Sequence, residues 1–188
     1  HDVPYKPTGS PFHLLDVYMP DPDSGPRAGA APAAAASELR PTVMYVHGGG
    51  FSLLSKDTHR VAALPFAKRG YVVFNINYRL GPEHTYPAPL EDAADALRWV
   101  QANATKYGAD PDRIILAGES AGGNLVTALT YMATHDTDEP FGRALREAAP
   151  KIRATVPIYG FLVVSSIGPA LLLLALTPIL KRWMHGRD

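Results

Sequence analysis

Residues 118–123, of sequence GESAGG, place Ser120 between small residues, a pattern typical of a nucleophilic serine on a sharp turn. The segment lies between a predicted buried strand, 112–117, and a predicted helix that starts at Ala121. Such a serine has a strained backbone, so bulky neighbours would collide with it. The Ala121 N–H, at the helix start, could then donate to an oxyanion. The segment predicts acyl-transfer chemistry on Ser120. The alternative is a serine that only caps a helix beside packing glycines.

A second segment, HGGGF at 47–51, follows a predicted β-branched strand, 42–46. Ordering three consecutive glycines is entropically costly, which indicates that the backbone must approach something closely. An acyl oxyanion is the natural partner, with Gly49 and Gly50 as N–H donors. A flexible turn is the alternative. Because His47 precedes the serine on the oxyanion side, we expect it to fix the loop and not to act as the base.

Composition narrows the classes of function further. The 188 residues fit one domain, and 46% hydrophobic content suffices for a core. Eighteen basic residues balance eighteen acidic ones, so no overall charge favours nucleic acid. The absence of cysteine excludes disulfides and thiolate metal sites, and nothing suggests a metal or cofactor. Since the chain starts with His1 and shows no signal-peptide pattern, we interpret it as a processed form or a fragment.

The chain alternates between strand and helix patterns. After an edge hairpin within 2–19 and a Gly/Pro/Ala-rich loop at 24–37, we expect strands at 42–46, 71–76, 112–117 and 152–159, and helices at 58–69, 90–107 and 120–134. Continuous apolar strands suit a sheet buried on both faces, and Gly108 is placed to stop a helix. The pattern predicts an α/β fold with a doubly wound, mostly parallel sheet in a domain at 1–160.

Five motifs in order carry a resemblance to a known family: those at 47–51, 77–84, 86–92, 110–113 and 118–123. The chain resembles the hormone-sensitive-lipase-like carboxylesterases of the α/β-hydrolase superfamily. The resemblance implies hydrolysis of a small-molecule ester through an acyl-enzyme on Ser120, with no cofactor. It also implies an oxyanion hole formed by Gly49, Gly50 and Ala121. Arg79, Glu83 and Asp92 are expected to form an ion network of structural importance.

The chain departs from this family after the serine. The family's acid and histidine follow the nucleophile, whereas only His135 and His185 occur downstream here. His135 is predicted about 22 Å along the serine's own helix, at ~1.5 Å per residue. We assign no acid or base, and from this pattern we interpret the domain as truncated or diverted near Gly160. Residues 161–180 are uncharged and precede basic residues, so they predict either a membrane-spanning helix or a buried core helix.

Two functional hypotheses follow from these patterns. The first is a serine carboxylesterase. The second is a catalytically inert, membrane-tethered relative that binds or scaffolds, because the acid and histidine are not found. The cellular location, cytoplasmic or membrane-associated, and the oligomeric state stay open.

Overall fold

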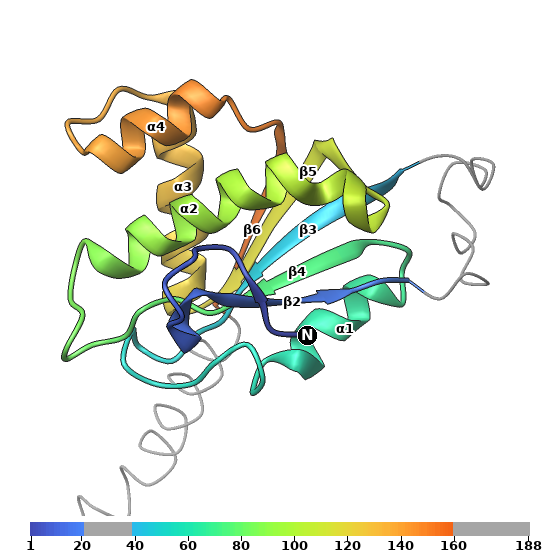
Figure 1. Cartoon of the computed structure of the whole chain (residues 1–188), viewed down its shortest axis with the longest axis horizontal. Helices are drawn as coiled ribbons and strands as arrows, with labels where there is room; N and C mark the ends of the chain where they lie inside the picture. The colour runs from blue at the N-terminus through green and yellow to red at the C-terminus, as the bar shows by residue number, and fades with distance from the viewer. Residues whose placement is uncertain (21–38, 160–188) are drawn as a thin grey trace, which may run out of the picture. The chain divides into compact units, whose positions relative to one another are not determined.

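The computed structural model describes residues 1–20 and 39–159, whose centre is a six-stranded sheet of order β1-β2-β4-β3-β5-β6 (Figure 1). The strands are β1 (Val3–Pro4), β2 (Leu14–Tyr18), β3 (Arg40–Val46), β4 (Val72–Ile76), β5 (Ala109–Glu119) and β6 (Ile152–Ile158). The pairs β1–β2 and β2–β4 are antiparallel, whereas β3, β4, β5 and β6 run parallel. The predicted α/β-hydrolase architecture, with an edge hairpin on a mostly parallel sheet, is confirmed.

Side chains of the central strands alternate between two hydrophobic cores. In β3, Val43 and Tyr45 belong to one core, while Met44 and Val46 belong to the other. Alternation is a consequence of the two-residue repeat of a strand. Both sets are fully buried, because helices cover both faces of the sheet at this point.

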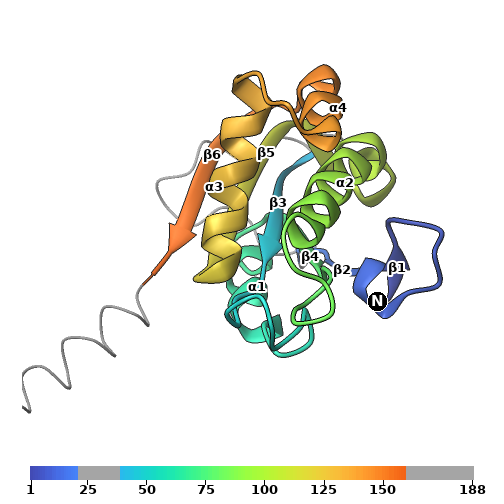
Figure 2. The ribbon, with the colours of Figure 1, turned by 90° about the vertical axis from the view of Figure 1, so that its left-hand side faces the viewer.

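The helices divide between these two cores. They are α1 (Arg60–Ala67), α2 (Ala88–Asn103), α3 (Ala121–Thr134) and α4 (Pro140–Ala148), with short 3-10 helices η1 (Pro11–His13) and η2 (Ala104–Tyr107). Helix α1 contributes Ala63 and Ala67 to the core that holds Tyr45. Helices α2, α3 and α4 supply the other core, and Figures 1 and 2 show these three gathered together, apart from α1.

Most predicted elements are present, with some differences at their ends. The helix predicted at 90–107 ends as η2, and Gly108 follows it in the left-handed conformation, at φ 70°. Helix α1 continues through Pro65. Helix α4 has no counterpart in the sequence prediction. It is short and amphipathic: Gly142 and Leu145 are buried as it packs on α2 and α3, whereas Arg143, Arg146 and Glu147 are exposed.

Two predictions concern segments outside the described residues: the loop at 24–37 and the apolar segment at 161–180. Within residues 1–20 and 39–159, no helix combines the length and apolar character needed to cross a bilayer.

The expected ion network around Arg79 and Asp92 exists, but its other members differ from the prediction. The fully buried Asp92 carboxylate accepts hydrogen bonds from Arg79 Nε at 2.7 Å and from Lys6 Nζ at 2.9 Å. His13 Nε2 lies 3.1 Å from the same carboxylate. The second carboxylate on Arg79 is that of Glu91, at 2.9 Å, so the assignment of Glu83 was wrong.

Burial acts to raise the pKa of Asp92, but hydrogen bonds from Arg79 and Lys6 hold this pKa below its ordinary value. The network joins the N-terminal segment, through Lys6, to α2. The positions of the two glutamates explain why the assignment of Glu83 was wrong. Glu91 is next to Asp92 at the start of α2, whereas Glu83 lies in the preceding turn.

We expect the substitution Asp92→Asn to destabilise the fold by roughly 3 kcal/mol, because the half-buried cations of Arg79 and Lys6 lose their shared carboxylate. Urea denaturation at pH 7 measures this change. Asp112→Asn, at an exposed position, is the matched control and should change the free energy of unfolding by less than about 0.5 kcal/mol. Equal effects of the two substitutions would contradict the role of the network.

Candidate functional site

The parallel register of β3 and β5 brings the two glycine-rich segments together. Val46, the last residue of β3, pairs with Gly118 near the end of β5. The residues that follow each strand therefore emerge side by side at the same edge of the sheet. From β3 the chain continues through α1 to β4, and then through α2 back across β3 to β5. Ligands of open α/β sheets bind where strand order reverses in this way.

Ser120 occupies a strained turn between β5 and α3. Its φ is 50° and its ψ is −112°, a conformation that costs a non-glycine residue about 1–3 kcal/mol. Hydrogen bonds hold the turn: the Ser120 N–H donates to the Ile158 carbonyl at 3.0 Å, and the Ser120 carbonyl accepts from the Asn124 N–H at 3.0 Å. The structure thus places Ser120 where the sequence predicted a nucleophile, directly before the first turn of α3.

Close backbone approach explains the glycine that follows the serine. A Cβ on Gly122 would collide with the carbonyl oxygen of Val46 and would lie 2.5 Å from that of His47. Any side chain there would push α3 away from the end of β3. Gly122 therefore lets the first turn of α3 pack directly onto the strand that precedes the HGGG segment.

The HGGG segment lies against the serine turn. A Cβ on Gly48 would be 2.9 Å from the Glu119 carbonyl oxygen and 3.4 Å from Ser120 Cβ. Gly49 has a φ of 112°, which only glycine adopts readily. Neither the Gly49 N–H nor the Gly50 N–H finds an acceptor among the described residues. The N–H of Ala121, as the first residue of α3, has no acceptor within its own helix.

His47 is turned into the protein and braces this loop. Its side chain is 1% exposed, and its Nδ1 donates to the Gly48 carbonyl at 2.7 Å. The ring stacks on Tyr78 with centroids 4.3 Å apart, and the Tyr78 hydroxyl donates to the His47 carbonyl. Burial lowers the pKa of His47 to about 4, although the bond to Gly48 opposes this shift. Through these contacts His47 fixes the HGGG loop in place.

No imidazole lies within hydrogen-bond distance of Ser120 Oγ in the described part of the chain. His59 pairs with Glu119, with Nε2 3.3 Å from Oε2. His135 is exposed at the end of α3 and stacks on Tyr131. His185 lies outside the described residues. Nor do the described residues contain a group of three or more His, Asp or Glu side chains that could hold a metal ion.

An apolar groove of about 620 Å³ begins beside the HGGG loop. Its walls come from Phe51, from the turn before α2, and from one side of α3, where Asn124, Leu125 and Ala128 line it. Because Asn124 is also bonded to the Ser120 carbonyl, the groove starts within one helical turn of the serine. The sequence analysis did not identify this groove, since its walls come from segments that are far apart in the chain.

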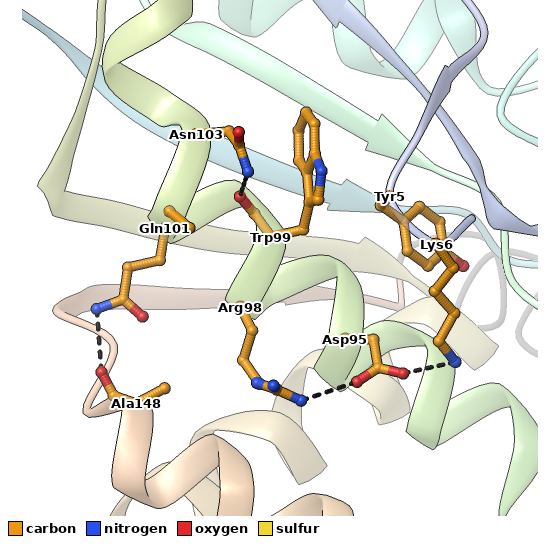
Figure 3. Close-up of a pocket in the computed structure, with 9 residues that line it drawn as sticks. Tyr5, Lys6, Asp95, Arg98, Trp99, Gln101, Asn103 and Ala148 are labelled. Carbon is orange, nitrogen blue, oxygen red and sulfur yellow. Dashed lines mark hydrogen bonds and ion pairs between the residues drawn. The ribbon is translucent and has the colours of Figure 1, made fainter.

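A second concavity lies on another part of the surface, between the N-terminal segment, α2 and the end of α4 (Figure 3). Asp95 stands between Lys6 and Arg98 there and pairs with both. Gln101 donates to the Ala148 carbonyl, and Asn103 donates to that of Trp99. These polar groups are engaged with one another, and none of the pocket's lining residues is a serine. The apolar groove, by contrast, adjoins the serine turn through Asn124.

Comparison with known proteins gives matches over most of the chain. A sequence model described as the alpha/beta hydrolase fold matches residues 43–175. The carboxylesterase NlhH of Mycobacterium tuberculosis is 48% identical over 94 residues, covering 50% of this chain and 30% of that protein. The esterase LipI of the same organism is 36% identical over 135 residues, covering 70% of this chain and 42% of that protein.

Solved structures give the same kind of match. Esterase B of Lactobacillus rhamnosis, in a structure with a tributyrin phosphonate inhibitor, has a TM-score of 0.62 and 27% identity. This match covers 75% of the chain described here and 42% of esterase B. The chain thus spans less than half the length of each of these relatives.

We expect the buried, neutral His47 to make the fold sensitive to mild acid. Between pH 6.5 and about 4, the unfolded chain binds a proton at this residue that the folded chain does not bind. The free energy of unfolding therefore rises with pH across this window, and it falls as the pH is lowered from 6.5 to 4. Replacing His47 by Asn keeps an N–H donor for Gly48 but removes the titration.

Urea denaturation of both proteins at pH 7 and pH 4.5 measures the difference. The loss of stability on acidification should be smaller in His47→Asn by about 2 kcal/mol. Other titrating groups, including His13, are present in both proteins, so their contributions to the loss of stability cancel in the comparison. Equal losses in the two proteins would show that His47 does not titrate as proposed.

Proposed function

Since this chain belongs to the α/β-hydrolase fold family, in its hormone-sensitive-lipase-like branch, we propose that it hydrolyses carboxylic esters of small molecules through an acyl-enzyme on Ser120. The observation that carries the proposal is the strained backbone of Ser120 beside a glycine loop whose Gly49 and Gly50 N–H groups have no acceptor within residues 1–20 and 39–159. The relatives named as esterases favour hydrolysis over an inert binding protein.

The proposed reaction has two halves. Ser120 Oγ attacks the ester carbonyl carbon while its proton passes to an imidazole, and the carbonyl oxygen becomes an oxyanion. The N–H groups of Gly49, Gly50 and Ala121 stabilise this oxyanion, and the start of α3 adds a favourable dipole. Collapse of this oxyanion intermediate breaks the ester C–O bond and expels the alcohol, which takes the proton from the imidazolium. Water then attacks the acyl-enzyme by the same steps and releases the acid.

The imidazole in this scheme must come from outside the described residues. His47 is held by Gly48 and Tyr78, and His59 is held by Glu119. Moving either ring to Ser120 would break contacts that fix the loop itself. The proposal therefore assigns the nucleophile and the oxyanion donors, and it leaves the acid and the base unassigned.

The apolar groove supports a substrate with an uncharged, hydrophobic portion. One wall is the exposed face of Phe51, directly after the glycine run, and the opposite wall includes Leu125 and Ala128 of α3. An acyl chain bound there would leave its carbonyl carbon near Ser120, at the end of the groove. We propose that the acyl chain, and not the alcohol, occupies this groove.

Incubation of the 188-residue chain with p-nitrophenyl acetate and with a fluorophosphonate probe tests the assignment of the nucleophile. Ser120→Ala should abolish labelling and lower turnover by at least about 1,000-fold, because no acyl-enzyme can form. Ser10→Ala, in the N-terminal segment and outside the groove, is the control and should label normally. A folded wild-type chain that neither labels nor turns over ester would refute the proposal and support the inert alternative.

Blocking the groove should change acyl-chain preference. Ala128→Trp fills the groove with a bulky ring, so kcat/KM for p-nitrophenyl hexanoate should fall at least 10-fold more than for the acetate, because ~1.4 kcal/mol of binding corresponds to a factor of ten. Thr127→Trp, on the exposed side of the same helix, should leave the ratio unchanged. Equal losses on both esters would place the acyl chain elsewhere.

A further inference from the structure

The pair formed by His59 and Glu119 lies next to the proposed nucleophile but has no part in the scheme above. His59 Nε2 lies 3.3 Å from Glu119 Oε2, and His59 Nδ1 lies 3.0 Å from the Thr58 hydroxyl. Both ring nitrogens are therefore engaged, and the ring cannot turn without losing a bond. The two side chains are 11% and 29% exposed, so the pair is more shielded from solvent than an ordinary surface ion pair.

The strand pattern explains why Glu119 faces His59. In β5, Ile115 and Ala117 lie on the side of the sheet that α1 covers, and Glu119 continues this alternation. His59 is the residue directly before α1. The pair is thus on the α1 side of the sheet, whereas the apolar groove is lined by residues of α2 and α3.

Glu119 contacts both ends of the loop that carries the oxyanion donors. At the start of the loop, the Gly48 backbone lies against the Glu119 carbonyl, close enough that a Cβ would be 2.9 Å away. At its end, His59 Nε2 lies 3.3 Å from the Glu119 carboxylate. Glu119 is itself the residue before Ser120. One residue therefore connects the nucleophile to the beginning and to the end of the loop at 48–59.

The middle of this loop is held by contacts to other parts of the fold, among them the Gly81 N–H, which donates to the Phe51 carbonyl at 2.8 Å. Lys56 is 3% exposed, and its Nζ contacts Asp16 of β2 at 3.1 Å, together with Asp2 and Asp57. These bonds fix the loop to the N-terminal hairpin but not to the serine turn. Between the anchors, Phe51 and Leu54 have positive φ values of 61° and 74°, which an unrestrained loop would rarely keep.

We propose that His59 and Glu119 are positioning residues, which hold the Gly49 and Gly50 N–H groups at the correct distance from Ser120 for oxyanion stabilisation. This inference rests on the proposed function of Ser120. Oxyanion donors act only at short range, and a misplacement of about 1 Å can reduce turnover on the order of 100-fold. The pair should therefore affect kcat, because the oxyanion forms only during the reaction, and it should affect KM little.

Steady-state kinetics with p-nitrophenyl acetate test this role. In His59→Leu and in Glu119→Leu, kcat should fall roughly 10-fold or more, with KM within about twofold of wild type. His59→Gln keeps an N–H donor near the position of Nε2 and should recover kcat to within about threefold. The double variant should be no slower than the slower single variant, because one interaction is lost in all three. A merely stabilising pair would leave kcat of the folded protein unchanged.

Amide hydrogen exchange gives a readout that does not depend on turnover. Exchange of the hydrogen-bonded N–H groups of Ser52, Leu53 and Asn124 should accelerate roughly 10-fold in either leucine variant, because the loop and the serine turn lose the same restraint. The same result is expected in a Ser120→Ala background. His135→Leu and Glu147→Leu, at exposed positions, are the matched controls and should change neither kcat nor exchange.

These outcomes separate the two proposals. A wild-type chain without turnover, but with accelerated exchange in the variants, would refute the esterase assignment and keep the positional restraint. Unchanged kcat or unchanged exchange in folded His59→Leu and Glu119→Leu would overturn the role of the pair. If Glu119→Leu does not fold, Glu119→Gln tests the same contact, and an unchanged kcat together with unchanged exchange would again overturn it.

Discussion

The parallel register that sets Val46 opposite Gly118 is the constraint on which the site depends. A slip of one residue would exchange the faces of every side chain in β3 and move Val43 and Tyr45 into the wrong core. It would also separate the HGGG loop from the serine turn, which touch only because the two strands end at the same level. Gly122 then closes the arrangement, since its missing side chain lets α3 rest on the carbonyl groups at the end of β3. Hydrophobic burial in two cores thus determines the position of the polar site.

Buried charges fasten the N-terminal segment to this framework. The Asp92 carboxylate pairs with Arg79 and Lys6, and the Lys56 ammonium group pairs with Asp16 and two further carboxylates. A buried ion is costly unless it is paired and hydrogen-bonded, so each cluster allows few alternative positions for the segments it joins. Burial acts to lower the pKa of Lys56, yet its three carboxylate partners hold this pKa above the ordinary value. The same lysine fixes the loop after the HGGG segment, so this loop is held by charges as well as by packing.

Local patterns in the sequence predicted most of this fold, and contacts between distant residues explain what they missed. Continuous apolar runs and three- and four-residue periodicity gave the central strands and α2, because one segment contains each signal. Helix α4 was missed since its burial depends mainly on Leu145 and on its contacts with α2 and α3. Glu83 was chosen over Glu91 because sequence proximity to Arg79 does not give side-chain direction. Ser120 and the glycines were predicted from their types and spacing, and the structure brings their two segments together. The partner of Glu119 was not, since His59 is 60 residues away (119 − 59).

The described residues separate two tasks that a serine hydrolase must combine. Oxyanion stabilisation needs fixed backbone N–H groups, which strand ends and a helix start can supply within this part of the fold. Activation of the serine needs an imidazole that stays basic near neutral pH and reaches Oγ. His47 meets neither need, because the burial that makes it a rigid brace also lowers its pKa to about 4. A histidine buried well enough to hold the HGGG loop is thereby a poor base, and so the proposed reaction needs a second imidazole in a more solvated position.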